Sequence, residues 1–286
     1  VFDNTESFSH IFADDTCIIA HDKQAAATLG ADFADFLLDF GIEVHIGSDN
    51  NTKPKTVVLF IPSITPAPHA PATTWPVDPT AILQLHPAPR DPNKLPRFIP
   101  SMASALYLGH RIANDLSSQT HMTERMSKAT QLFGALRKNF LGSKDVWAKV
   151  KSRVFQSMIL PTLLDGVECC ILTRAIMDEL TTTYHRMVRS ALRITPMLQR
   201  QNRITSETML LRLGLQPLHY YVDLKTLGFA GHIERMNSTR LPKLLRDSAL
   251  PGPKKRGGQH KTHLNFVQQS LRRKGIPHAT WKELAQ

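Results

Sequence analysis

The first sixty residues show two different spacings of apolar side chains, which predict a hairpin followed by a helix. Residues 8 to 20 are expected to form a strand, a tight turn and a second strand, because the apolar, β-branched segment 16 to 20 follows an acidic pair suited to a hairpin tip. Between Gln24 and Phe40 apolar residues recur at helical spacing, and Gly41 stands where a helix would end. Short strands are expected over 42 to 46 and 56 to 61.

Residues 62 to 96 interrupt these patterns. They hold ten of the 19 prolines. Proline lacks a backbone donor and has a fixed φ, so this stretch is predicted to contain neither helix nor sheet and to form an extended linker or a surface insertion.

Beyond residue 100 the spacing becomes helical. Two apolar stripes predict packed amphipathic helices: Met122, Met126, Ala129, Phe133, Leu136 and Phe140 in the first, and Val146, Val150, Val154 and Met158 in the second. A helix over 175 to 194 is expected to turn Leu180, Tyr184, Met187 and Ala191 inward, and further helices are expected over 220 to 236 and 262 to 273.

These elements predict an α+β chain in which a small antiparallel fragment is joined by the Pro-rich linker to a mainly α-helical region. The predicted segments are 1–61, 62–100, 101–250 and a basic C-terminal segment, 251–286. Only three cysteines occur, two of them adjacent, so we expect free thiols and neither a disulfide framework nor a zinc site. No apolar run is long enough to span a bilayer, and an intracellular protein without a membrane partner is expected.

Charge divides the chain in the same way. The formal net charge is +11, which favours a polyanionic partner. Residues 1 to 60 hold three Lys and Arg against ten Asp and Glu, so of the 35 basic and 24 acidic residues 32 and 14 lie beyond residue 60. The acidic end and the basic remainder are therefore expected to have different roles.

The adjacent carboxylates Asp14 and Asp15 are the first candidate for chemistry. Like charges at one turn repel each other unless a cation neutralises them, and Mg²⁺ prefers such oxygen ligands. Two-metal nucleotidyl transfer needs hard ligands of this kind on a rigid scaffold. An exposed acidic turn without function is the alternative. A phosphatase fits poorly, since its nucleophile and acid/base are spaced Asp-x-Asp.

Cationic side chains on two predicted helices are the second candidate. Repeated cations along a groove bind phosphates without reading bases, whereas an ordinary solvated helix face is the alternative. The residues concerned are Arg125, Lys128, Arg137 and Lys138 on the first helix and Lys149, Lys151 and Arg153 on the next.

Six short motifs follow one another along the chain. Three lie before residue 113: Phe12-Ala13-Asp14-Asp15, Phe40-Gly41-Ile42-Glu43-Val44 with Lys55-Thr56, and Tyr107-Leu108-Gly109 with Ile112. The later three are Arg125-Met126 with Lys128-Ala129, Leu160-Pro161 through Leu163-Leu164 to Gly166 and Glu168, and Gly231-His232-Ile233-Glu234-Arg235-Met236 with Arg240-Leu241-Pro242. In this order they resemble motifs of the reverse transcriptases of LINE-type (non-LTR) retrotransposons. The first three resemble the family's metal-binding turn, the palm segment that ends in Lys-Thr and the primer-contacting hairpin, and the later three resemble its thumb helices and a block common near its C-terminus.

The resemblance implies part of an RNA-directed DNA polymerase, with a truncated palm in 1–61 and a thumb within 101–250. It implies that Asp14 and Asp15 bind Mg²⁺ (or Mn²⁺), that Lys55 acts on the pyrophosphate leaving group and that Tyr107 and Gly109 contact the primer. A solvated Lys55 and a Tyr107 packed in the core are the alternatives. The implied partners are an RNA template and a DNA primer, in the nucleus, the cytoplasm or both.

The sequence also departs from the family's pattern. Asp165 stands where the family usually has Tyr, and Cys170 where it usually has Trp. No residue before Phe8 resembles the strand that carries the third catalytic carboxylate, and the fingers are missing, so we expect a missing N-terminal polymerase portion and no polymerisation by this chain alone. The competing hypothesis is a non-catalytic, helical nucleic-acid-binding protein from a decayed retroelement.

Overall fold

The computed structural model divides the chain into two compact units, Val1–Ser117 and Ser118–Gln286, and each unit is described by itself. The structure describes residues 7–12, 15–20, 23–42, 44, 56–59, 61, 83–85, 97–99, 102–247, 262–277 and 281. The predicted division into four segments stays a prediction.

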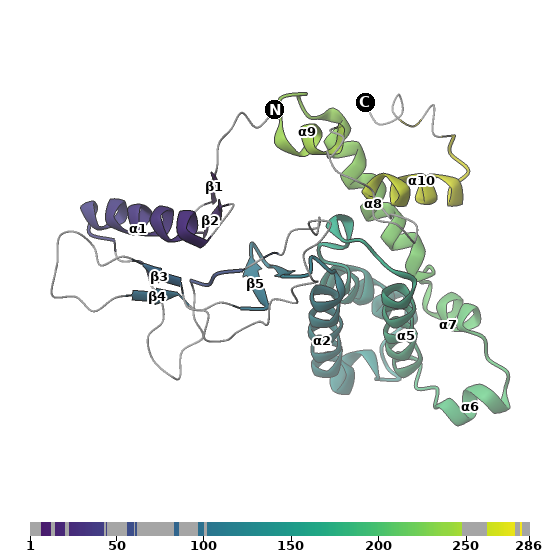
Figure 1. Ribbon diagram of the computed structural model, residues 1–286. Helices are drawn as coiled ribbons and strands as arrows, with labels where there is room; N and C mark the ends of the chain where they lie inside the picture. Colours follow the sequence, from purple (N-terminus) through teal and green to yellow (C-terminus); the bar gives the residue numbers. More distant parts are fainter. Residues whose placement is uncertain are drawn as a thin grey trace, which may run out of the picture. The chain divides into compact units, whose positions relative to one another are not determined.

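Unit 1 contains three antiparallel strand pairs within its described residues. The first joins β1 (Ser7–Phe12) to β2 (Asp15–Ala20), as the sequence predicts. The other pairs join β3 (Leu83–Leu85) to β4 (Arg97–Ile99) and β5 (Ser104–Tyr107) to β6 (His110–Ala113). Figure 1 shows the β1–β2 and β3–β4 pairs near the one long helix described in this unit, which β2 and β3 contact.

That helix, α1 (Lys23–Asp39), ends where the sequence predicts. Gly41 adopts φ +72°, a conformation that glycine accepts without strain, and the Ile42 N–H donates to the Leu37 carbonyl at 3.0 Å. The predicted apolar face is only partly used, because Phe36 and Phe40 are exposed while Ala27 and Ala34 are buried.

Two expectations for unit 1 are wrong. Residues 56 to 59 form no strand, although the Val58 carbonyl accepts a hydrogen bond from the Met102 N–H at 2.9 Å. The Pro-rich stretch does contain a strand, β3, because the run 80–86 within it is free of proline and rich in apolar residues. Of the strand expected over 42 to 46, the described Ile42 and Val44 are not in a strand, and the other residues lie outside the described ranges.

The described residues of unit 2 form helices joined by turns and loops, with no strand, so the chain has the α+β composition that the sequence predicts. Its helices, including the two π-helical turns η1 and η2 and the 3₁₀ turn η3, are α2 (Gln119–Leu136), η1 (Arg137–Leu141), α3 (Ala148–Val154), η2 (Phe155–Ile159), α4 (Leu160–Leu163), η3 (Val167–Cys169), α5 (Arg174–Ala191), α6 (Pro196–Gln201), α7 (Ser206–Leu213), α8 (Leu218–Arg235), α9 (Leu241–Asp247) and α10 (His263–Arg273). Within the described ranges, no helix has the length and apolar character needed to cross a membrane.

Local capping explains where several of these helices begin. A threonine side chain accepts a hydrogen bond from the backbone N–H three residues later at the start of four helices, which satisfies one of the free amides of the first turn. These caps are Thr173 for α5, Thr195 for α6, Thr205 for α7 and Thr262 for α10.

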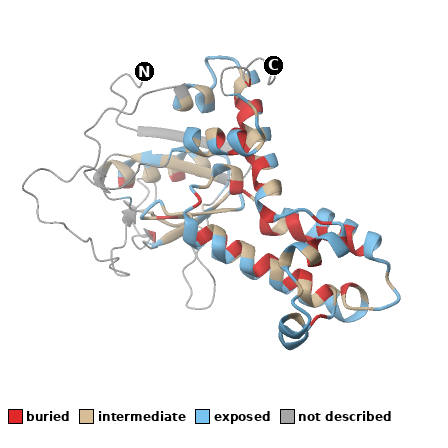
Figure 2. Ribbon diagram, turned by 90° about the vertical axis from the view of Figure 1, so that its right-hand side faces the viewer, coloured by how far each residue is buried: buried red, intermediate tan, exposed pale blue. Residues whose placement is uncertain are grey.

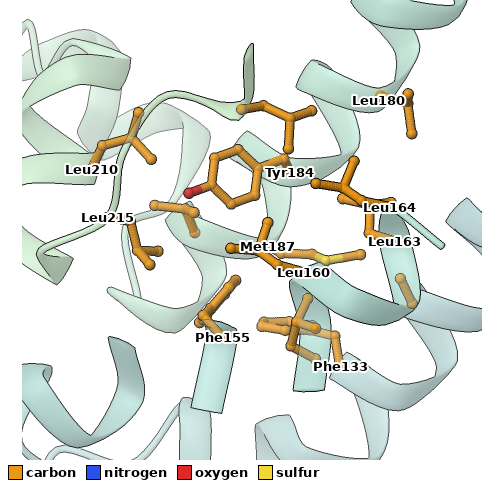
Figure 3. Close-up of a cluster of buried hydrophobic side chains, with 14 of the residues drawn as sticks. Phe133, Phe155, Leu160, Leu163, Leu164, Leu180, Tyr184, Met187, Leu210 and Leu215 are labelled. Atoms are coloured by element: carbon orange, nitrogen blue, oxygen red, sulfur yellow. The ribbon is translucent and has the colours of Figure 1, made fainter. Parts of the chain in front are cut away.

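The core of unit 2 forms where α2 and α5 lie side by side and η2, α4 and α7 pack against them (Figure 1). Figure 2 shows the buried positions as red bands along these helices. Figure 3 shows the Tyr184 ring among Leu160, Met187 and Leu215, and its hydroxyl donates to the Gln216 carbonyl at 3.0 Å. A buried phenol therefore links the core to the loop after α7 without leaving its polar atom unsatisfied.

The predicted inward face of α5 is confirmed, and so is the first apolar stripe, but the second stripe is wrong at two of its four positions, while Val154 packs against the core. Val150 and Met158 are exposed, whereas Phe155 and Ile159 are fully buried. The line through Phe155 and Ile159 lies one residue further along the helix and carries larger apolar side chains, so burying it removes more apolar surface from water.

The C-terminal helix α10 is held on α8 by a buried carboxylate. Asp223 is 1% exposed and accepts hydrogen bonds from Ser270 Oγ at 2.7 Å and Arg273 Nε at 3.0 Å. Because both donors come from α10, this polar contact fixes the register of the two helices alongside the apolar contacts of Val267 and Leu271.

Candidate nucleic-acid interface and metal-binding turn

The acidic turn lies between β1 and β2. The strand register pairs Phe12 with Asp15, the last residue of β1 with the first residue of β2. Asp14 lies outside the described residues, and Asp15 is described only as the first residue of β2. Metal binding by this pair stays a prediction.

Two adjacent carboxylates supply the hard oxygen donors that Mg²⁺ and Mn²⁺ accept, so the donor type fits the predicted metal. No group of three or more His, Cys, Asp or Glu side chains suited to a metal occurs among the described residues. Lys55, the other predicted catalytic residue, lies outside the described ranges.

The predicted tight hairpin around Tyr107 and Gly109 is confirmed. Tyr107 pairs with His110, and the two residues between them have positive φ, +47° at Leu108 and +79° at Gly109. This is the turn geometry that matches the twist of a two-residue hairpin, and it strains a leucine but suits a glycine. Tyr107 is half-buried and Gly109 is exposed; contact with a primer stays a prediction.

The prediction that Arg125 belongs to an exposed phosphate-binding surface is wrong. It is 8% exposed, and its Nη1 lies 2.9 Å from an Asp165 carboxylate oxygen. The main-chain carbonyl of Asp165 also lies 3.0 Å from His121 Nε2. The Asp at this unusual position therefore has a cationic partner, and Arg125 joins α2 to the end of α4 instead of facing a ligand.

The prediction that Lys151 belongs to the exposed phosphate-binding surface is also wrong. Its side chain is buried, and Nζ donates to the carbonyls of Ser143 at 2.6 Å and Ala191 at 3.2 Å. Burial lowers the pKa of the Lys151 ammonium, and the nearby charge of Arg193 lowers that pKa further. Lys151 thus connects the turn before α3 to the end of α5, and no phosphate can reach it at the surface.

The remaining predicted cations are exposed. Lys128 pairs with Glu124 one turn earlier on α2, at 2.7 Å, which neutralises part of its charge. Arg137 and Lys138 lie on η1, and Lys149 and Arg153 lie on α3. The predicted set of seven thus becomes five surface cations on α2, η1 and α3.

A groove between α3 and α7 brings Lys149 and Arg153 together with a third cation, Arg212. The groove has a volume of about 420 Å³ and is lined by Ala148, Lys149, Ser152, Arg153, Gln156, Arg212, Leu213 and Gly214. Ser152 Oγ donates to the Gly214 carbonyl at 3.2 Å, and Gln156 Nε2 donates to Ser152 Oγ at 3.1 Å. The first bond joins the two walls of the groove, and the second lies within the wall formed by α3 and η2.

A second groove, of about 550 Å³, runs between α2 and α5 and has the opposite balance of charge. It contains Asp178 and Glu179 but only one cation, Arg186. Its other lining residues are Thr123, Met126, Ser127, Thr130, Gln131, Thr182 and Thr183.

Sequence reasoning missed Arg212. Its position in the last turn of α7 is readable from the chain, because a cation there complements the helix dipole. The proximity of Arg212 to α3 cannot be read from the chain, because Ser152 and Gly214, which join the two helices, are 62 residues apart.

Comparison with known proteins gives one informative similarity. No protein-family model matches the chain, and no solved structure matches it. The chain is 26% identical over 171 residues to an uncharacterized transposon-derived protein of Caenorhabditis elegans, an alignment that covers 55% of this chain and 58% of that protein. The chain thus spans little more than half of its relative's length, and the similarity indicates a transposon-related origin.

Proposed function

We propose that this chain is part of a transposon-derived RNA-directed DNA polymerase, in which the β1–β2 hairpin carries the metal ligands and unit 2 holds the nucleic acid. The observation that carries the proposal is the register of the strands, in which Phe12 pairs with Asp15 and β2 begins at Asp15, one of the two predicted ligands. A short, paired hairpin limits how far adjacent carboxylates can move apart, and such rigidity favours binding of a divalent cation.

In this proposal Asp14 and Asp15 hold Mg²⁺ or Mn²⁺ at the tip. The bound metal supplies activation of a primer 3′-hydroxyl and stabilisation of the leaving pyrophosphate. Lys55 contributes a cation for the leaving group. The exposed cations of unit 2, Lys149 and Arg153 among them, bind phosphates and hold the duplex in place.

A second candidate function, non-catalytic nucleic-acid binding, is favoured by the exposed cations alone. In that case the Asp pair has no role, and affinity for nucleic acid depends on salt but not specifically on a divalent metal. The two functions therefore differ in whether the carboxylates and the metal act together.

The discriminating experiment measures the affinity of the chain for a primed RNA template by fluorescence anisotropy, with Mg²⁺ or with EDTA at matched ionic strength. For the polymerase fragment we expect Mg²⁺ to tighten binding, and Asp14→Asn with Asp15→Asn to abolish that gain. In EDTA the same variant should bind as well as the natural chain or better, since removing two carboxylates reduces repulsion of phosphate.

The matched control is Asp32→Asn with Asp35→Asn, which removes two carboxylates from α1. This control should keep the gain in Mg²⁺. Equal binding with and without Mg²⁺ by the natural chain would reject the polymerase proposal and favour non-catalytic binding, whereas loss of the gain in both double variants would reject a specific role of the hairpin tip.

A further inference from the structure

We propose that the groove between α3 and α7 is the site where unit 2 binds the phosphodiester backbone of a nucleic acid, through Lys149, Arg153 and Arg212. The inference rests on the nucleic-acid partner of the proposed function. It specifies which surface of unit 2 binds the nucleic acid, and it adds Arg212 to the cations that the sequence predicted.

Cations from two helices converge at this groove. Lys149 and Arg153 are four residues apart on α3 and therefore share one face, while Arg212 comes from the last turn of α7. A nucleic-acid strand presents successive phosphates, so it is held best by several donors placed along a groove.

The positive charges of these three side chains are available to a ligand. All three side chains are exposed, and none of them forms an ion pair with a carboxylate in the part of the chain that the structure describes. Lys128, by contrast, is already paired with Glu124. A phosphate entering the α3–α7 groove does not have to displace a described carboxylate.

The base of the groove is rigid. Leu213 is 1% exposed and belongs to the core, and Ser152 is buried and bonded to the Gly214 carbonyl. Lys149, Arg153 and Arg212 therefore extend from a backbone that is fixed before a ligand arrives, which lowers the ordering cost of binding.

The α2–α5 groove provides an internal comparison within the same unit. It is larger, yet Asp178 and Glu179 outnumber Arg186. The lining itself holds more carboxylates than cations, although Asp178 also lies 4.0 Å from Arg174 on α5. Volume alone therefore does not select the site, and the balance of charge in the lining distinguishes the two grooves.

The test compares the chain with three single variants, Lys149→Gln, Arg153→Gln and Arg212→Gln, against Arg186→Gln in the α2–α5 groove. All four remove one exposed positive charge from unit 2. The probes are an RNA–DNA duplex and a single strand of equal length and unrelated sequence, titrated across about 50 to 200 mM salt.

We expect each α3–α7 variant to lower the slope of log affinity against log salt by about 0.9 for the duplex, or about 0.7 if the groove takes a single strand. The same slope corresponds to a roughly eightfold loss of affinity at about 0.1 M salt for one lost phosphate contact. Arg186→Gln should change the slope by much less, and the effects should be independent of base sequence.

A slope for Arg212→Gln equal to that of Arg186→Gln, with the natural chain still binding, would overturn the groove assignment and leave the proposed function standing. No binding by the natural chain at low salt would overturn both. Equal affinity for polyglutamate of the same charge would reject a nucleic-acid site in favour of an acidic protein partner. Thermal unfolding shows whether Arg212→Gln is folded. If it is misfolded, the salt slope of Arg153→Gln, on the other wall of the groove, tests the groove assignment in its place.

Discussion

The two grooves of unit 2 differ in charge although both lie between pairs of helices from one core. The α3–α7 groove has Lys149, Arg153 and Arg212 in its lining, whereas the α2–α5 groove has Arg186 beside Asp178 and Glu179. Both contact the core, through Leu213 in the first groove and Met126 in the second. The difference shows that the chain's excess of positive charge is distributed unevenly over this unit.

Burial also limits which cations of a helix can reach a groove. On α3, Lys149 and Lys151 are two residues apart and chemically identical, yet the first is exposed and the second is buried with two carbonyl acceptors. Since residues two apart on a helix point in different directions, one lysine faces a groove and the other faces the core. Counting basic residues along the sequence therefore overstates the charge that a ligand can meet.

The largest expected effect is a loss of stability on replacing Lys151, the buried lysine of this pair. Lys151→Met should lower the free energy of unfolding by about 1–3 kcal/mol, because it leaves the carbonyls of Ser143 and Ala191 without their donor. Chemical denaturation followed by circular dichroism measures it. Lys149→Met is the matched control, and it should change stability by less than about 0.5 kcal/mol while weakening nucleic-acid binding. Equal stability losses would contradict the structural role of Lys151.

A smaller effect is expected from making the second groove resemble the first. Asp178→Asn with Glu179→Gln leaves Arg186 as the charged residue in that groove's lining. Affinity for a duplex should rise by about two- to fivefold at low salt, because exposed charges contribute only weakly. Asp32→Asn with Asp35→Asn makes the same change in net charge on α1. If it raised affinity equally, net charge and not the groove would be responsible.

The smallest expected effect is on pH dependence and involves His185 on α5, next to Arg186. Burial lowers the pKa of the His185 imidazole below its ordinary value near 6.5, so the folded chain binds fewer protons here than the unfolded chain. His185 should therefore reduce stability as pH falls below about 6.5. Unfolding midpoints at about pH 7.5 and pH 5.5 should differ less in His185→Gln than in the natural chain, and an unchanged difference would contradict the assignment.

The local features of the fold could be predicted from the sequence to a large extent. The β1–β2 hairpin, the end of α1 at Gly41 and the inward face of α5 depend on neighbouring residues, whose conformational preferences and apolar spacing act within a few turns. The strand β3 was missed because the density of prolines around it outweighed a short proline-free run.

The candidate site could be predicted only in part. Residue type and spacing identified Lys149 and Arg153 as surface cations, but they also selected Lys151 and Arg125, which are buried. Helical spacing does not show which face of a short helix meets the core when apolar residues occur on more than one face. On α3 and η2 the larger side chains, Phe155 among them, decided this by burying more apolar surface.

The sequence by itself thus determined the α+β composition, the hairpin that joins the strands around Asp14, the main helices and the basic character of the region beyond residue 60. Only the tertiary structure decided which cations are exposed and which of them converge. The reason is distance along the chain: Lys151 meets a carbonyl 40 residues away, and Ser152 meets one 62 residues away. Such contacts arise from packing in three dimensions, which no local pattern encodes.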